Sequence, residues 1–305
     1  MAIVFMGTPE FAVPSLQALH SRFGVALVVT TPDAPQGRGL RLLPSPVKRA
    51  AMELGIPVAQ PERLRDEHFL EQIRQLRPEF IIVVAFRILP PELYTQAWRA
   101  AFCVHPSLLP KYRGAAPIHW TIIRGERWSG VTSFLLEQRV DTGAILLQRS
   151  IPVPEDATAG ELHDLLMPLA AEVAVETVEG LRAGTLVPIP QDEHSASTAP
   201  KLRPEDCHLR WDRPAEEVRR WIHGLSPEPG AWGSIAGERF RFLRARAHPE
   251  QLLPPRSFRI QEGRFLIGCM PGCVEILELQ RAGRRAMRVE EFLRGWRGPS
   301  SGTVE

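Results

Sequence analysis

Residues 80–84, FIIVV, decide the fold class of this chain. Five apolar residues without polar alternation are typical of a strand covered on both faces, as in a parallel sheet flanked by helices. Around this run, short apolar stretches alternate with segments of helical periodicity, which is the rhythm of an α/β fold. We expect strands at residues 3–5, 25–30, 80–84 and 101–105, and helices at 14–20 and 46–54.

The second half of the chain follows a different pattern. Apolar residues recur at helical spacing over 158–182, and this long helix is expected to close a first domain of residues 1–184. Residues 185–204 are rich in Pro, Ser and Ala, as linkers are. Residues 205–305 then predict a C-terminal OB-like β-barrel, because short strands alternate with turn residues. Its expected helices are 214–222 and 290–295, and its expected strands are 232–235, 239–246, 264–269 and 274–279.

Composition limits the class of protein. The chain has 305 residues, of which 44% are hydrophobic and 24% charged, so we expect a soluble protein with two packed domains rather than a disordered chain. The N-terminus lacks the features of a signal peptide and no apolar run is long enough to span a membrane, which predicts a cytoplasmic protein. The four cysteines have no zinc-site or disulfide-framework spacing, and we expect reduced thiols and no metal.

The stretch FCVHPSLLPKYRGAAPI, residues 102–118, is where we expect the chemistry. His105 ends an expected strand, and open α/β sheets bind ligands beyond the carboxyl ends of their strands. Cys103 lies two residues earlier, so its side chain leaves the same face of the strand. Asp141 is a candidate partner for the imidazole. Only one glycine, Gly7, follows the first strand, so a nicotinamide or flavin site is not expected.

Two groups of basic residues raise the expectation of a nucleic-acid partner. Residues 31–48 form a long connection with prolines and glycines, and a protruding basic loop suits contact with phosphates or bases, although a solvated loop explains it equally well. The expected barrel carries further arginines on one strand and in a following loop, as barrels that bind oligonucleotides do. The candidate RNA-binding residues are Arg38, Arg41 and Lys48 in the first group, and Arg239, Arg241, Arg284 and Arg285 in the second.

Several motifs resemble the methionyl-tRNA formyltransferase family over nearly the whole chain. The core motifs, shared with other enzymes that use 10-formyltetrahydrofolate, are HPSLLPKYRGAAPI at 105–118 and DTG at 141–143. The motifs that point to the tRNA enzyme are PQGRG at 35–39, SPVK at 45–48 and LQRAGRRAM at 279–287. The resemblance implies a Rossmann-like formyl-transfer domain, an OB-like tRNA-binding domain, 10-formyltetrahydrofolate as formyl donor, initiator methionyl-tRNA as acceptor, and a monomer.

The resemblance also implies residue roles. His105 matches the family histidine that supports the oxyanion, Asp141 matches the carboxylate that tunes it and helps proton movement, and Arg38 matches the loop arginine that engages the acceptor stem. The residues expected around the folate and substrate cleft are Phe86, Arg87, Ser107, Leu108, Leu109, Pro110, Arg113, Gly114 and Arg139.

Three positions depart from the family pattern. Cys103 replaces an asparagine, and a thiol is a poor hydrogen-bond donor to an oxyanion compared with an amide. Arg87 and Arg139 each replace a glycine near the folate pocket, where a large cation either blocks the pocket or turns outward.

Two other functions remain open. The first is a 10-formyltetrahydrofolate hydrolase or a formyltransferase to another amine, in which Cys103 and His105 activate a thiolate or leave room for water. The tRNA-type loop and the C-terminal domain count against it, and inert packing of the cysteine is the favoured alternative. The second is a non-catalytic relative that binds tRNA without transferring a formyl group.

Overall fold

The computed structural model describes residues 1–36 and 41–305. The chain forms two compact units. The first contains Met1–Gly114, Trp128–Pro152 and His163–Ala199, and the second contains Ala115–Arg127, Val153–Leu162 and Pro200–Glu305. Each unit is thus built from three separate segments of the chain, whereas the sequence predicted three consecutive regions: 1–184, a linker and 205–305. Residues 185–199 of the expected linker belong to the first unit.

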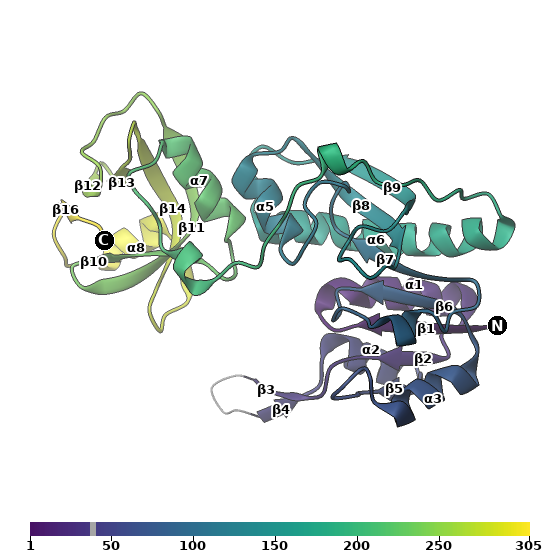
Figure 1. Ribbon diagram of the computed structural model, residues 1–305. Coiled ribbons are helices and arrows are strands. Elements are labelled where there is room, and N and C mark those ends of the chain that lie inside the picture. Colours follow the sequence, from purple (N-terminus) through teal and green to yellow (C-terminus); the bar gives the residue numbers. More distant parts are fainter. Residues whose placement is uncertain (37–40) are drawn as a thin grey trace. The chain divides into compact units, whose positions relative to one another are not determined.

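A seven-stranded sheet forms the centre of the first unit, in the order β5-β2-β1-β6-β7-β8-β9 (Figure 1). The five strands from β5 to β7 run parallel, whereas β8 and β9 are antiparallel to their neighbours. Every residue of β6 is buried, as the FIIVV run predicts. The strands are β1 (Ala2–Gly7), β2 (Leu27–Val29), β5 (Val58–Ala59), β6 (Pro78–Val84), β7 (Ala100–His105), β8 (Trp128–Leu135) and β9 (Ile145–Pro152).

Helices pack against this sheet through apolar faces. In α3, the N-cap carboxylate of Asp66 accepts a 3.0 Å hydrogen bond from the N–H of Phe69. Phe69 and Ile73 are four residues apart, so they share one helix face, and both join a core cluster with Val4 of β1. The helices that lie wholly or mainly in this unit are α1 (Val13–Phe23), α2 (Pro46–Glu53), α3 (Glu67–Leu76), α4 (Pro91–Tyr94) and α6 (Ala159–Ala183).

The connection between β2 and α2, expected as a protruding basic loop, contains two short antiparallel strands. Strands β3 (Ala34–Gln36) and β4 (Arg41–Leu43) pair with each other. Helix α2 then starts at Pro46, with the hydroxyl of Ser45 accepting a 3.1 Å hydrogen bond from the N–H of Lys48.

The second unit contains an antiparallel sheet that closes on itself. Its order is β10-β11-β14-β13-β12-β16, with β15 paired to β14 (Figure 1). Ile235 of β10 bridges Val304, just beyond β16, and Ser234 and Glu305 exchange main-chain hydrogen bonds of 2.7 and 2.9 Å. Because these contacts join the two edges, the sheet is a closed barrel, as expected. Its strands are β10 (Ala231–Ile235), β11 (Glu238–His248), β12 (Ser257–Gln261), β13 (Arg264–Gly268), β14 (Cys273–Arg281), β15 (Ala286–Arg288) and β16 (Ser301–Thr303).

Three helices complete the second unit: α5 (Pro117–Arg124), α7 (Ala215–Gly224) and α8 (Val289–Gly295). Val218 and Ile222 of α7 contribute to the barrel core. At the end of α7, a Cβ on Gly224 would lie 2.4 Å from Cγ1 of Ile123 in α5. A glycine is required there, because no larger residue permits this close approach of the two helices.

Candidate active site

His105 ends β7 at the carboxyl edge of the parallel sheet, and its side chain is almost completely buried. Its Nε2 lies 2.9 Å from the carbonyl oxygen of Tyr112. A carbonyl only accepts, so Nε2 carries the hydrogen. Its Nδ1 faces Oδ2 of Asp141 at 3.7 Å, which is too long for a direct hydrogen bond. The structure therefore brings together the imidazole and the carboxylate that the sequence predicts as partners.

Asp141 lies in the connection between β8 and β9 and has a left-handed backbone conformation, with φ of 56°. Its Oδ2 accepts a 2.8 Å hydrogen bond from the main-chain N–H of Gly114. Its carbonyl oxygen accepts one of 2.9 Å from Nε2 of Gln191. Both ends of the residue are therefore held, and the side chain is turned towards His105.

Cys103 lies beside His105 on β7 and packs, half-buried, against the core cluster that includes Val83. Burial and then the negative charge of Asp141 raise the pKa of the Cys103 thiol well above its usual value. A thiol held in its protonated form is a poor nucleophile. This counts against the thiolate chemistry that remained open from the sequence.

The loop after His105 is fixed by its own polar groups. The hydroxyl of Ser107 donates a 2.8 Å hydrogen bond to the carbonyl of Lys111. The N–H of Leu109 bonds to Oγ1 of Thr132 on β8, and its carbonyl accepts from Gln148 on β9. Leu108 packs closely on Gly130, and the carbonyl of Pro110 accepts from the N–H of Ser197. These four predicted cleft residues therefore anchor the loop to its neighbours.

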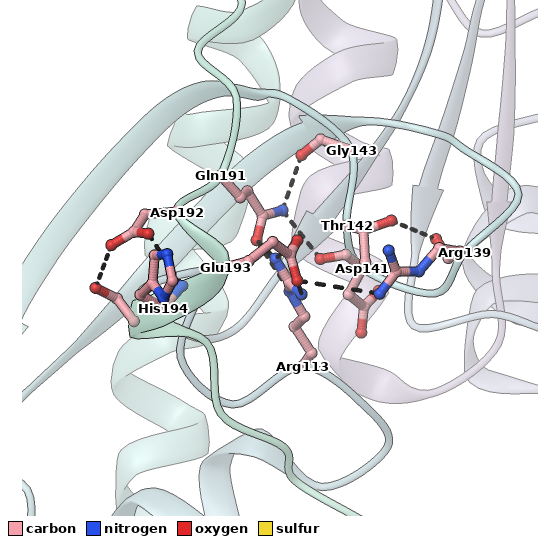
Figure 2. Close-up of polar contacts among 10 residues, drawn as sticks. Arg113, Arg139, Asp141, Thr142, Gly143, Gln191, Asp192, Glu193 and His194 are labelled. Carbon is pink, nitrogen blue, oxygen red and sulfur yellow. Dashed lines mark hydrogen bonds and ion pairs between the residues drawn. The ribbon is translucent and has the colours of Figure 1, made fainter.

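Arg113 makes several hydrogen bonds from this loop to the segment after α6. Its guanidinium donates to Oε1 of Gln191 and to both carboxylate oxygens of Glu193, at distances of 2.9–3.1 Å (Figure 2). The main chain of Arg113 also pairs with residues 197–199. Arg113, predicted as a cleft residue, thus ties the loop to the segment that follows α6.

The two arginines at positions where the resemblance implies glycines have different surroundings. Arg87 donates hydrogen bonds of 2.8 and 3.0 Å to the carbonyls of Pro61 and Glu62, and its guanidinium lies 5.1 Å from the ring centre of Phe86. Arg139 has a side chain that is 76% exposed and lies 4.0 Å from the carboxylate of Glu193. Arg139 therefore turns outward, and Arg87 is engaged by the turn at residues 61–62.

The basic residues of the first predicted RNA-binding group are only partly placed. Arg38 lies outside the described residues, and Arg41 begins β4. Lys48 pairs with Asp33, with its Nζ 2.7 and 2.9 Å from the two carboxylate oxygens. This ion pair lowers the pKa of Asp33, chiefly through the hydrogen bond from Lys48. The ammonium group of Lys48 is thus already neutralised within the protein.

The structure brings the second group together at one end of the barrel. Arg239 and Arg241 lie near the start of β11, whose partner β14 ends just before the turn that carries Arg284 and Arg285. The guanidinium of Arg239 lies 4.0 Å from the ring centre of Trp232, and Arg241 pairs with Glu228 at 3.1 Å. Arg285 pairs with Glu291, whereas Arg284 is exposed. Two pairs of arginines that are distant from each other in sequence thus lie at the same end of the barrel.

Three residues in the segment after α6 stabilise this site but were not predicted from the sequence. Gln191, Glu193 and Ser197 contact the loop at 110–113. They belong to a Pro- and Ser-rich stretch, whose composition is that of a linker, so local sequence carried no signal for them.

Within residues 1–36 and 41–305, no group of three or more His, Cys, Asp or Glu is arranged to hold a metal ion. None of the helices in the same ranges has the length and apolar character needed to cross a bilayer.

Comparison with known proteins gives consistent matches over both units. The family profile described as "Formyl transferase" matches residues 1–178, and that of the "Formyl transferase, C-terminal domain" matches residues 201–297. The chain is 44% identical to a methionyl-tRNA formyltransferase of Chlorobium luteolum over 97% of both chains.

Solved structures show the same fold at lower identity. The methionyl-tRNA formyltransferase of Clostridium thermocellum superposes with a TM-score of 0.56 at 19% identity, covering 82% of this chain and 95% of that one. An N-formyltransferase of Helicobacter canadensis, in complex with folinic acid and dTDP-3-aminofucose, gives a TM-score of 0.69 at 20% identity, covering 92% and 98%.

Proposed function

Because this chain belongs to the methionyl-tRNA formyltransferase family, we infer that it transfers a formyl group to the α-amino group of methionyl initiator tRNA. The formyl donor of this family is a folate, and we propose 10-formyltetrahydrofolate as the donor here. The observation that carries the proposal is that Nδ1 of His105 lies 3.7 Å from Oδ2 of Asp141 at the carboxyl edge of the sheet, in a chain that aligns with such an enzyme over 97% of its length.

The reaction needs charge stabilisation and one proton transfer. The amine nitrogen attacks the formyl carbon, a tetrahedral oxyanion forms, and the bond from that carbon to the folate nitrogen breaks as a proton passes from the amine to that nitrogen. We assign His105 to support of the oxyanion, to which its Nε2–H would donate in place of the carbonyl of Tyr112 that it contacts in the structure. Asp141, which is ordered by Gly114 and faces the imidazole, is assigned to movement of the proton.

Cys103 is assigned no covalent role. Its raised pKa keeps it protonated, and the S–H group is a weak donor to an oxyanion. Loss of one oxyanion donor typically lowers the rate by about 10²–10³-fold. We therefore propose an active but slowed transferase rather than a thiolate hydrolase.

The arginines at the end of the barrel are proposed to bind the tRNA backbone. Arg239 and Arg284 contribute positive charge to this region, and Arg241 and Arg285, which pair with Glu228 and Glu291, lie beside them. Phosphate contacts of this kind position a nucleic acid without reading its sequence. The contacts of Arg38, Arg41 and Lys48 with tRNA, the monomeric state and the cytoplasmic location stay predictions.

One assay tests the proposal. The protein is incubated with 10-formyltetrahydrofolate, with and without methionyl initiator tRNA, and formyl-methionine and formate are followed. Formyl-methionine that forms only with charged tRNA supports the proposal. Formate released without tRNA indicates a hydrolase, and tRNA binding without either product indicates a non-catalytic relative.

A further inference from the structure

We propose that Gln191 is a positioning residue for Asp141, and that Arg113 fixes Gln191 in turn. The inference rests on the proposed function, because it concerns the carboxylate that is assigned there to proton movement.

The conformation of Asp141 has to be maintained by its surroundings. A left-handed backbone, here with φ of 56°, costs an L residue on the order of 1 kcal/mol. Gly114 holds the carboxylate, and Gln191 holds the backbone: its Nε2 donates to the carbonyl of Asp141 at 2.9 Å and to that of Gly143 at 2.8 Å. One amide thus spans the turn that presents Asp141 to His105.

Arg113 determines which way this amide points. Oε1 of Gln191 accepts hydrogen bonds from Nε and Nη2 of Arg113, at 3.1 and 2.9 Å. Because a guanidinium only donates, the oxygen of the amide has to face Arg113 and the NH₂ group has to face the two carbonyls. The side chain of Arg113 is only 10% exposed and is also paired with Glu193. Figure 2 shows Gln191 between the guanidinium and the turn at Asp141.

The geometry of His105 and Asp141 therefore depends on Gln191, which lies 50 residues after Asp141 in the chain. Without the amide, two carbonyls lose their donor and the turn is free to relax. A displacement of about 1 Å in a reacting geometry is enough to lower a rate by about 10²-fold. We therefore expect loss of the amide to lower kcat by about 10- to 100-fold and to leave KM for folate and for tRNA nearly unchanged.

The first test compares Gln191→Met with Asp192→Asn. Methionine has nearly the volume of glutamine but neither donates to the carbonyls nor accepts from Arg113 as an amide does. Asp192 is the adjacent residue, and its carboxylate bonds to the N–H of His194 and the hydroxyl of Ser195 instead. The expected result is a kcat loss for Gln191→Met alone, with rates normalised to folded protein. Equal kcat in both variants and the wild type overturns the inference.

A double-mutant cycle separates positioning from general stabilisation. If Gln191 acts through Asp141, Gln191→Met lowers kcat by less than about 2-fold in an Asp141→Asn background, because coupled residues are not additive. If the two losses multiply, Gln191 acts independently of Asp141 and the inference is wrong.

Arg113→Lys tests the same link without altering Gln191. Lysine keeps the charge but lacks the planar fork, and we expect a smaller loss of kcat that is likewise absent in the Asp141→Asn background. An additive effect contradicts the role given to Arg113.

A wild type that forms no formyl-methionine counts against the proposed function, and the inference falls with it. An active wild type with an unimpaired Gln191→Met variant counts against the inference alone.

Discussion

The main-chain N–H of Gly114 donates a 2.8 Å hydrogen bond to Oδ2 of Asp141. This contact is made at a residue with φ of 121°, a conformation that favours glycine. A Cβ at position 114 would also lie 2.7 Å from the carbonyl oxygen of Ala199. A side chain at position 114 would therefore force the loop away from the segment after α6 and displace the donor to the carboxylate.

Gly114→Ala is expected to impair both stability and catalysis. The added methyl group has no room and the backbone conformation is unfavourable, so we expect a loss of about 1–3 kcal/mol in the free energy of unfolding. We also expect kcat to fall by at least about 10-fold, because the donor to Asp141 is displaced. Urea denaturation and steady-state formylation measure the two effects, and an unchanged kcat would contradict the role given to this N–H.

Cys103→Asn is expected to increase activity. An asparagine amide supplies donors where the thiol supplies a weak one, and a single oxyanion donor is worth about 10²–10³ in rate. We expect kcat to rise by about 10-fold or more, with Cys103→Ala, which also lacks a donor, close to the wild type. If asparagine leaves kcat unchanged, position 103 does not contact the oxyanion. If alanine abolishes activity, the thiol has a role that we have not assigned to it.

Arg284→Ala is expected to weaken tRNA binding in a salt-dependent manner. The logarithm of the binding constant falls linearly with the logarithm of the salt concentration, and loss of one phosphate contact makes this negative slope less steep by about 1. Arg259→Ala is the matched control, because Arg259 is an exposed arginine on β12, which is separated from β11 in the sheet by β14 and β13. Filter binding of charged tRNA over a range of salt concentrations measures both slopes. Equal slopes for the two variants would exclude Arg284 from the RNA-binding surface.

Acid is expected to destabilise the second unit through His223. Burial, and then the positive charges of Arg219 and Arg244, lower the pKa of His223 to about 4. Its Nε2 contacts the main chain of Ala245, and its Nδ1 has no hydrogen-bond partner among the described residues. Because the unfolded state binds a proton near pH 6.5 and the folded state only near pH 4, stability falls as the pH decreases between these values.

The full effect of this titration is on the order of 3 kcal/mol. Urea denaturation of the wild type and of His223→Gln, which does not titrate, at pH 7.5 and pH 4.5 measures it. We expect the wild type to lose more stability than the variant over this interval. Equal losses would show that another group is responsible.

The regular elements were predictable where their patterns are local. The FIIVV run identifies a buried parallel strand, and the spacing of apolar residues from Leu162 to Val178 identifies α6. Helix α3 also carries a readable signal, since Asp66 caps a segment with Phe69 and Ile73 on one face, although we predicted no helix there. Strand β8 has no such signal, because nearly all of its residues are buried and polar ones are included.

The sequence alone determined the two architectures, the place of His105 at a strand end and the candidate residues of the site, since these follow from periodicity and motifs of a few residues. The folded structure was needed to show that Gly114 and Gln191 hold Asp141, that Arg113 is engaged by Gln191 and Glu193, and that Arg139 turns outward. The reason is that these contacts join residues 27–80 positions apart. Their formation depends on the packing of the whole sheet and of the segment after α6, which no local pattern encodes.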